Sequence, residues 1–154
     1  MRFAKVYIEI SNLCNLSCRF CPGTKRPKGR MDLERLSSIL EKLKGYTEFV
    51  YFHLMGEPLL HPQLPQFLEL AGKNGFKVIL TTNGTLLEKR KELLLSSPAV
   101  HKVNISLHAF EANDLSVPFE TYVDGCLDYA KAAEGKKLTV FRLWNSGGED
   151  RQNG

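Results

Sequence analysis

Segments typical of strands alternate with segments typical of helices along the chain, and this alternation constrains the fold more than any other feature. Runs rich in β-branched and aromatic residues cover residues 5–11, 49–55, 76–82, 100–107 and 138–144. Between them, apolar residues recur at helical spacing over residues 32–43, 64–74, 86–96 and 119–134. Strands that alternate with helices form parallel sheets through right-handed crossovers. The sequence therefore predicts an α/β fold built from repeated β-α units.

The chain has 154 residues, which is enough for one domain with its own core. We expect residues 1–145 to form this domain and the polar residues 146–154 to be a disordered tail. The formal net charge is only +4, which gives no strong signal of nucleic-acid binding. The sequence contains no apolar run long enough to cross a bilayer and no secretory signal, so we expect a cytoplasmic protein.

Three of the four cysteines are grouped at positions 14, 18 and 21, directly after the first predicted strand. In a reducing compartment, such grouping indicates a metal, redox or nucleophilic site rather than disulfides. Three thiolates are one short of a structural zinc site and of a fully protein-ligated iron–sulfur cluster. Cys126 lies on the apolar side of a predicted helix, where we expect a small buried hydrophobic residue. The three cysteines therefore suit a four-iron cluster with one open iron, or a zinc site completed by a histidine.

Polar or reactive side chains occur at the carboxyl end of every predicted strand. In order along the chain, these are Cys14, the pair Gly56 and Glu57, Asn83, Ser106 and Arg142. The carboxyl ends of parallel strands meet at one edge of the sheet, where such folds bind their ligands. We therefore expect these residues to converge on a single site.

Residues 14–21, Cys-Asn-Leu-Ser-Cys-Arg-Phe-Cys, resemble the CxxxCxΦC motif of radical S-adenosylmethionine (radical SAM) enzymes, with Phe20 at the aromatic position. Residues 55–58, Met-Gly-Glu-Pro, resemble the GGEP motif of that family, with methionine in place of the first glycine. Residues 82–85 resemble its TNG turn, and residues 104–108 are similar to its fourth-strand segment. The resemblance extends over nearly the whole chain, with the motifs in the family's order.

This resemblance implies that Cys14, Cys18 and Cys21 bind a [4Fe-4S] cluster and that S-adenosylmethionine (SAM) binds the open iron. An electron from a reducing donor would then cleave SAM to methionine and a 5′-deoxyadenosyl radical, which abstracts hydrogen from a substrate. The SAM contacts that it implies are Phe20 at the adenine, Gly56 and Glu57 at the methionine ammonium, Asn83, Ser106 at the ribose or carboxylate, and Arg142 at the carboxylate. The alternative for Asn83 is a plain turn, and the alternative for Arg142 is a surface position without a role.

The family's fold is a partial (βα)6-type barrel, and here the pattern stops after the fifth strand. We therefore expect a shortened barrel that a partner chain or an oligomer could complete. Residues 26–31 and 56–62 are most similar to the subgroup that modifies peptides or proteins, so a peptide or protein is the expected substrate. Two alternatives stay open at this point: a non-catalytic cluster-binding subunit or truncated relative, and a zinc-stabilised α/β binding domain.

Overall fold

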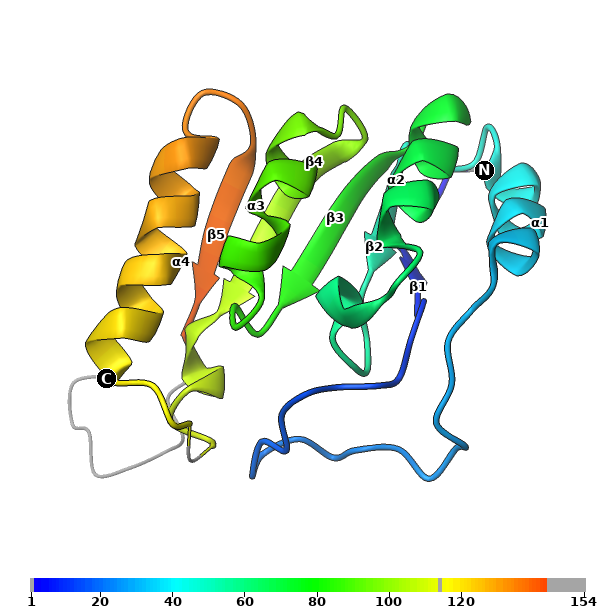
Figure 1. Ribbon diagram of the computed structural model, residues 1–154. Helices are drawn as coiled ribbons and strands as arrows, with labels where there is room; N and C mark the ends of the chain where they lie inside the picture. The colour runs from blue at the N-terminus through cyan, green and yellow to red at the C-terminus, as the bar shows by residue number, and fades with distance from the viewer. Residues whose placement is uncertain (1, 114, 144–154) are drawn as a thin grey trace, which may run out of the picture.

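The computed structural model describes residues 2–113 and 115–143 and confirms the predicted alternation of strands and helices (Figure 1). The strands are β1 (Val6–Ile8), β2 (Phe49–Phe52), β3 (Lys77–Thr82), β4 (Val100–Ser106) and β5 (Leu138–Arg142). The helices are α1 (Leu33–Leu43), α2 (Leu64–Lys73), α3 (Leu87–Ser96) and α4 (Phe119–Ala133), with the 3-10 turns η1 (Pro58–Leu60) and η2 (Leu107–Ala109). The predicted tail and residues 144–145 of the predicted domain lie outside the described residues.

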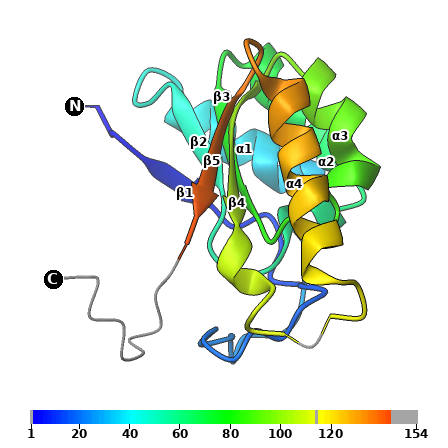
Figure 2. The same cartoon turned by 90° about the vertical axis from the view of Figure 1, so that its left-hand side faces the viewer.

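The five strands form one parallel sheet in the order β1-β2-β3-β4-β5. Parallel crossovers are right-handed, and here each one moves to the next strand in the same direction. All four helices therefore lie on the same face of the sheet, as Figure 2 shows. This is the partial barrel that the sequence predicted, with five strands in the part of the chain that the structure describes.

Local signals in the sequence explain where α1 begins and ends. Oδ1 of Asp32 accepts a hydrogen bond of 2.7 Å from the backbone N–H of Arg35, which caps the first turn. Leu36 and Leu40, one turn apart, are fully buried against the sheet. Gly45, with φ of +78°, follows the last turn and leads the chain away from the helix. The predicted limits of this helix are therefore confirmed.

Two strands, β1 and β2, end three residues earlier than predicted, and after each of them the chain leaves the sheet. The predicted strand of residues 5–11 pairs only over Val6–Ile8, and that of residues 49–55 only over Phe49–Phe52. Beyond β2, Leu54 and Gly56 take φ angles of 149° and 78°, which are not strand conformations. The apolar residues Leu54 and Met55 continue the predicted run there, but the backbone turns.

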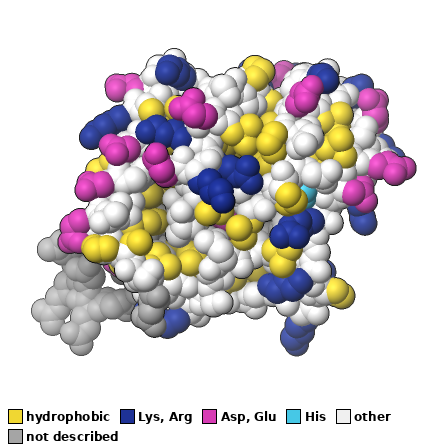
Figure 3. Space-filling model, in the orientation of Figure 1, with side chains coloured by type: hydrophobic (Ala, Val, Ile, Leu, Met, Phe, Trp, Pro, Cys, Tyr) yellow, Lys and Arg dark blue, Asp and Glu magenta, His cyan; other side chains and the backbone are white. Residues whose placement is uncertain are grey.

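The core lies between the sheet and the helices, and the opposite face of the sheet is more open. Val50 and Phe52 of β2 point toward the helices and are fully buried, whereas Tyr7 and Val140 are exposed on the two edge strands. On the outer, helix-covered face, acidic and basic side chains are interspersed (Figure 3). Among the described residues, no helix combines the length and apolar character needed to span a membrane.

Candidate cofactor site at the carboxyl ends of the strands

The three cysteines lie on the long segment between β1 and α1, which runs beneath the carboxyl ends of the strands (Figure 1). The base of this cysteine loop, residues 9–32, is closed by an antiparallel bridge between Ser11 and Arg30. The side chain of Asn12 donates to the carbonyl of Pro27 at 2.9 Å and accepts from the N–H of Gly29 at 2.7 Å. These bonds hold the two ends of the loop together, so the cysteines start from a fixed base.

The cysteine loop also packs directly against the turn after β2. The backbone N–H of Glu57 donates to the carbonyl of Leu13 at 2.7 Å. A Cβ atom added at Gly56 would lie 2.6 Å from the Ser11 carbonyl oxygen and 2.7 Å from that of Leu13. Glycine is therefore required here because the backbone of the cysteine loop approaches so closely. Gly56 also lines the cavity described next. Its predicted contact with SAM stays a prediction.

One open cavity of about 620 Å³ brings the predicted site residues together. All three cysteines line it, and so do Phe20, Gly56, Glu57, Asn83, Ser106 and Arg142. These residues come from the cysteine loop and from the ends of β2, β3, β4 and β5. The expected convergence at one edge of the sheet is thus present, in a cavity of the size that small-molecule ligands occupy.

The thiols are free, and their surroundings differ. Cys14 and Cys21 are exposed, and Cys18 is half-buried. Burial raises the pKa of Cys14, although the N–H of Leu16 and the amide of Asn83 work in the opposite direction. Among the described residues, no three His, Cys, Asp or Glu side chains are gathered closely enough to hold one metal ion. The zinc site of the alternative interpretation, like the three-cysteine cluster, stays a prediction.

The fourth cysteine is buried, as predicted. Cys126 is 1% exposed on α4 and lies beneath Gly84, where it does not line the cavity. Burial raises the pKa of its thiol to about 11. The cysteines that line the cavity are therefore Cys14, Cys18 and Cys21. This donor set fits a four-iron cluster with one iron left for an external ligand.

Glu57 is only 1% exposed, yet both of its carboxylate oxygens are hydrogen-bonded. Oε1 accepts from the N–H of Leu59 at 3.0 Å, and Oε2 accepts from the N–H of Asn83 at 2.7 Å. Burial raises the pKa of Glu57 to about 7, while these two backbone donors and the side chain of Thr82 oppose that rise. The carboxylate thus links the turn after β2 to the end of β3, an internal role that the sequence did not indicate.

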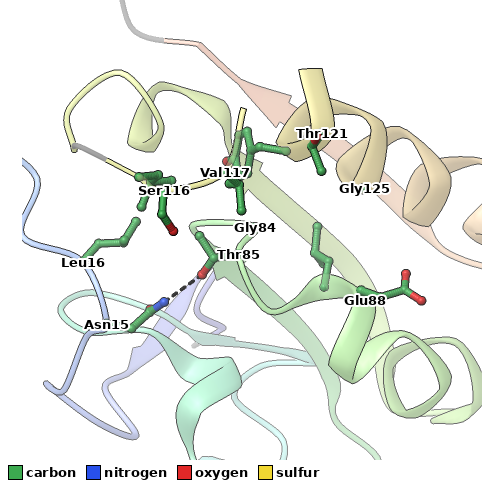
Figure 4. Close-up of a pocket in the computed structure, with 12 residues that line it drawn as sticks. Asn15, Leu16, Gly84, Thr85, Glu88, Ser116, Val117, Thr121 and Gly125 are labelled. Atoms are coloured by element: carbon green, nitrogen blue, oxygen red, sulfur yellow. Dashed lines mark hydrogen bonds between the residues drawn. The ribbon is translucent and has the colours of Figure 1, made fainter. Parts of the chain in front are cut away.

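Asn83 both forms a turn and contacts the cysteine loop. Its Oδ1 accepts from the N–H of Thr85 at 3.1 Å, which is the turn that the sequence left as an alternative. Its Nδ2 donates to Oδ1 of Asn15 at 3.0 Å, and Asn15 in turn donates to the Thr85 hydroxyl at 2.8 Å (Figure 4). The three side chains tie the cysteine loop to the turn after β3. Nothing in the local sequence around Asn15 indicated this contact.

A second, smaller cavity of about 350 Å³ lies on the other side of Leu16, whose side chain lines both cavities. Figure 4 shows Leu16 and Ser116 on one side of this second cavity and Thr121 of α4 on another. Its lining is mainly apolar and includes the turn after β3 and the segment before α4. The cysteine loop is therefore flanked by two segments that are distant in sequence.

The rim of the larger cavity carries positive charge. Lys28 and Arg142 both line it, and the carboxylate among its lining residues is the internally bonded Glu57. Burial, and then the nearby charge of Arg142, lowers the pKa of His53 in the same cavity. The backbone carbonyl of Arg142 lies 3.2 Å from Nδ1 of His108. An anionic group such as a carboxylate would be favourably placed at this rim.

The chain matches a protein-family model and several characterised proteins. Residues 8–144 match the model of the radical SAM superfamily. A tungsten-containing aldehyde ferredoxin oxidoreductase cofactor-modifying protein from Pyrococcus furiosus is 36% identical over 94 residues, which cover 57% of this chain and 26% of the relative. A GTP 3′,8-cyclase from Chlorobaculum tepidum is 30% identical over 110 residues, which cover 69% of this chain and 33% of the relative. The chain thus spans about a third or less of these two proteins.

Solved structures share the fold. BtrN in complex with AdoMet and 2-DOIA has a TM-score of 0.70 and 24% identity, over 92% of this chain and 58% of that protein. Streptococcus suis SuiB bound to S-adenosylmethionine has a TM-score of 0.66 and 19% identity, over 89% of this chain and 33% of that protein. At these levels of identity the similarity shows a common architecture, which here is the five-stranded partial barrel.

Proposed function

Because the chain belongs to the radical SAM superfamily, we propose that Cys14, Cys18 and Cys21 bind a [4Fe-4S] cluster and that the larger cavity binds SAM. This superfamily uses the cluster and SAM together. The observation that carries the proposal is that the three thiols and the residues at the strand ends line one cavity of about 620 Å³. The fourth cysteine, Cys126, is buried in α4 and does not line that cavity, so one iron is left for SAM.

When bound, the cluster supplies the electron that cleaves SAM to methionine and a 5′-deoxyadenosyl radical, which abstracts hydrogen from a substrate. In our proposal, Arg142 pairs with the carboxylate of SAM, Ser106 donates to the ribose or the carboxylate, and Phe20 flanks the adenine. These roles are supported by the shared lining of the cavity and by its positive rim.

Glu57 has a more limited place in this proposal than the family motif implies. A carboxylate offers about four lone-pair positions, and the backbone of Leu59, the backbone of Asn83 and the side chain of Thr82 use three of them. One position is left for the ammonium group of SAM. The proposed role is therefore shared: Glu57 holds the two strand ends together and presents its remaining lone pair to the cavity.

We propose that the protein is an enzyme that receives its electron from a separate reducing donor. The proposed substrate is a peptide or protein, because residues 26–31 and 56–62 resemble those of the subgroup that modifies peptides or proteins. The outer edge of β5 has no neighbouring strand among the described residues, so a partner chain or a second copy could pair there.

One observation favours the alternative of a subunit that binds the cluster and SAM without cleaving it. Leu138 and Val140 on β5 are 53% and 40% exposed, so no other part of the described chain covers this side of the barrel. A radical reaction is normally closed off from water, because solvent can intercept reactive intermediates. The experiment described next separates the enzyme from the non-catalytic subunit.

The test is reductive cleavage of SAM by protein that has been reconstituted with iron and sulfide without oxygen. With dithionite as reductant, we expect methionine and 5′-deoxyadenosine, measured by chromatography and mass spectrometry. Cys18→Ala should assemble no cluster and give no product, whereas the matched control Cys126→Ala should retain both. Cluster and bound SAM without 5′-deoxyadenosine would support the subunit instead, and a protein that assembles no cluster would refute both. Product formation that rises with a cell extract, and falls after protease digestion of that extract, would support a peptide substrate.

A further inference from the structure

The side-chain amide of Asn113 contacts the cysteine loop at Cys18, from which it is 95 residues distant in sequence. Nδ2 of Asn113 lies 3.1 Å from Sγ of Cys18 and donates a hydrogen bond to it. The same Nδ2 donates to the carbonyl of Ala109 at 2.7 Å, and Oδ1 accepts from the N–H of Ser17 at 2.9 Å. The three hydrogen bonds of this amide therefore join two chain segments: the cysteine loop, at Ser17 and Cys18, and the segment after β4, at Ala109.

The orientation of this amide is set by backbone groups and does not depend on the sulfur. The N–H of Ser17 can only donate, so it must face Oδ1 of Asn113. The carbonyl of Ala109 can only accept, so it must face Nδ2. A flipped amide would place Nδ2 against the N–H of Ser17 and Oδ1 against the carbonyl of Ala109, and neither pair can hydrogen-bond. The second hydrogen of Nδ2 is consequently directed at Cys18 whatever the state of the thiol.

The segment that carries Asn113 is itself fixed on both sides. Arg19 donates from its backbone N–H to the carbonyl of Ala112 at 3.2 Å, and from Nη2 to the carbonyl of Glu111 at 2.7 Å. Ala109 belongs to η2, which directly follows β4, and is 3% exposed. The ring of Phe110, within this segment, packs against α4, with its centroid 5.2 Å from that of Tyr122. The amide of Asn113 therefore links Cys18 to the chain directly after β4, which fixes the place of Cys18 relative to the sheet edge.

The contact at Cys14 is weaker. Nδ2 of Asn83 lies 3.8 Å from Sγ of Cys14, and its shorter bond, of 3.0 Å, goes to Oδ1 of Asn15. The amide nitrogen of Asn83 is thus committed mainly to Asn15, whereas that of Asn113 lies 3.1 Å from the sulfur of Cys18. Of the two asparagines, we therefore expect the substitution of Asn113 to change the surroundings of a cysteine sulfur more than the substitution of Asn83.

We propose that Asn113 is a positioning residue for the cluster ligand Cys18 and that it raises the reduction potential of the bound cluster. The inference rests on the proposed function. Reduction adds one negative charge to the cluster and its sulfur ligands, and an N–H donor directed at a ligand sulfur stabilises that charge. A cluster held next to Asn113 is therefore easier to reduce than the same cluster without this donor.

Two substitutions separate placement of the loop from effects on the cluster. Asn113→Leu has nearly the same shape and its side chain makes no hydrogen bonds, so it loses the bonds to Ser17, Ala109 and Cys18. Asn113→Asp keeps an acceptor for the N–H of Ser17 but faces both the sulfur of Cys18 and the carbonyl of Ala109 with negative charge in place of a donor. Asn74→Asp is the matched control, because its amide bonds only to Leu70 at the end of α2 and does not line the cavity.

The first measurement is hydrogen exchange of the Ser17 amide in the cluster-free chain. We expect exchange about fivefold faster in Asn113→Leu, the factor for one lost hydrogen bond, and near wild-type exchange in Asn113→Asp. The second is the midpoint potential of the reconstituted cluster, followed by redox titration. It should fall from wild type to Asn113→Leu and further to Asn113→Asp, while Asn74→Asp stays at the wild-type value. A purely structural role would instead change both measurements in the same order.

The possible outcomes are distinct. Midpoint potentials that are equal in wild type and both Asn113 variants would overturn this inference and leave the proposed function intact. Ser17 exchange that is unchanged in Asn113→Leu would likewise overturn it, and this arm needs no cluster. A wild-type chain that assembles no cluster would refute the proposed function, and with it the claim about the potential.

Discussion

Replacing the buried carboxylate Glu57 with glutamine gives a sharp test of how this site is held together. Glutamine keeps one acceptor oxygen but turns an NH2 group toward either the N–H of Leu59 or the N–H of Asn83, which are 3.0 and 2.7 Å from the wild-type oxygens. A buried backbone donor that loses its acceptor costs about 1–3 kcal/mol. We therefore expect the free energy of unfolding of Glu57→Gln to be lower by about that amount at pH 4.5 to 5, measured by urea unfolding of the cluster-free chain.

The same substitution should also change how stability depends on pH. The pKa of Glu57 is about 7 in the folded chain against an ordinary value of 4.5, so between these values the folded state binds more protons than the unfolded state. The free energy of unfolding of the wild type should therefore fall by about 3 kcal/mol as the pH rises through this window, and level off above it. Glutamine does not titrate, so the difference between wild type and variant should shrink by that amount and can change sign by pH 8.

A control and a refutation complete this experiment. Glu69 is exposed on α2, where a hydrogen bond from Lys73 lowers its pKa, so Glu69→Gln should show only a small effect of opposite sign. A difference between wild type and Glu57→Gln that stays constant from pH 4.5 to pH 8 would show that burial does not control the protonation of Glu57. A variant as stable as the wild type at every pH would refute the internal linking role altogether.

Two further predictions concern glycine and cysteine positions. Gly56→Ala should unfold at much lower urea concentration than the wild type, because its Cβ would overlap the backbone of residues 11–13, whereas Gly45→Ala, with the same φ of +78° and nothing within 4 Å, should cost only about 1 kcal/mol. Equal losses in the two variants would contradict the close approach. Cys126→Ala should lower the free energy of unfolding by roughly 1 kcal/mol through lost packing and leave the iron content unchanged; iron lost from this variant, but retained by Cys18→Ala, would reverse the ligand assignment.

The strand and helix pattern could be predicted because it depends on residues close together in sequence. Asp32 caps α1 and Gly45 follows its end, as their residue types and spacing indicate. The parallel order of the sheet then follows from the handedness of the crossovers, and it brings Cys14 and Arg142, at opposite ends of the chain, to one cavity. The ends of β1 and β2 were predicted too far along the chain, since residue preference does not report where the backbone turns away.

The sequence by itself determined the fold class, the three-cysteine motif and the edge of the sheet at which the candidate site lies. Only the tertiary structure decided what each residue at that edge contacts. It showed that Gly56 is needed by the backbone of the cysteine loop, that Glu57 bonds to the backbone after β3, and that Asn113 reaches Cys18. The physical reason is one of range: helical and strand patterns arise from neighbours a few residues apart, whereas these contacts join segments that meet only after the sheet has formed.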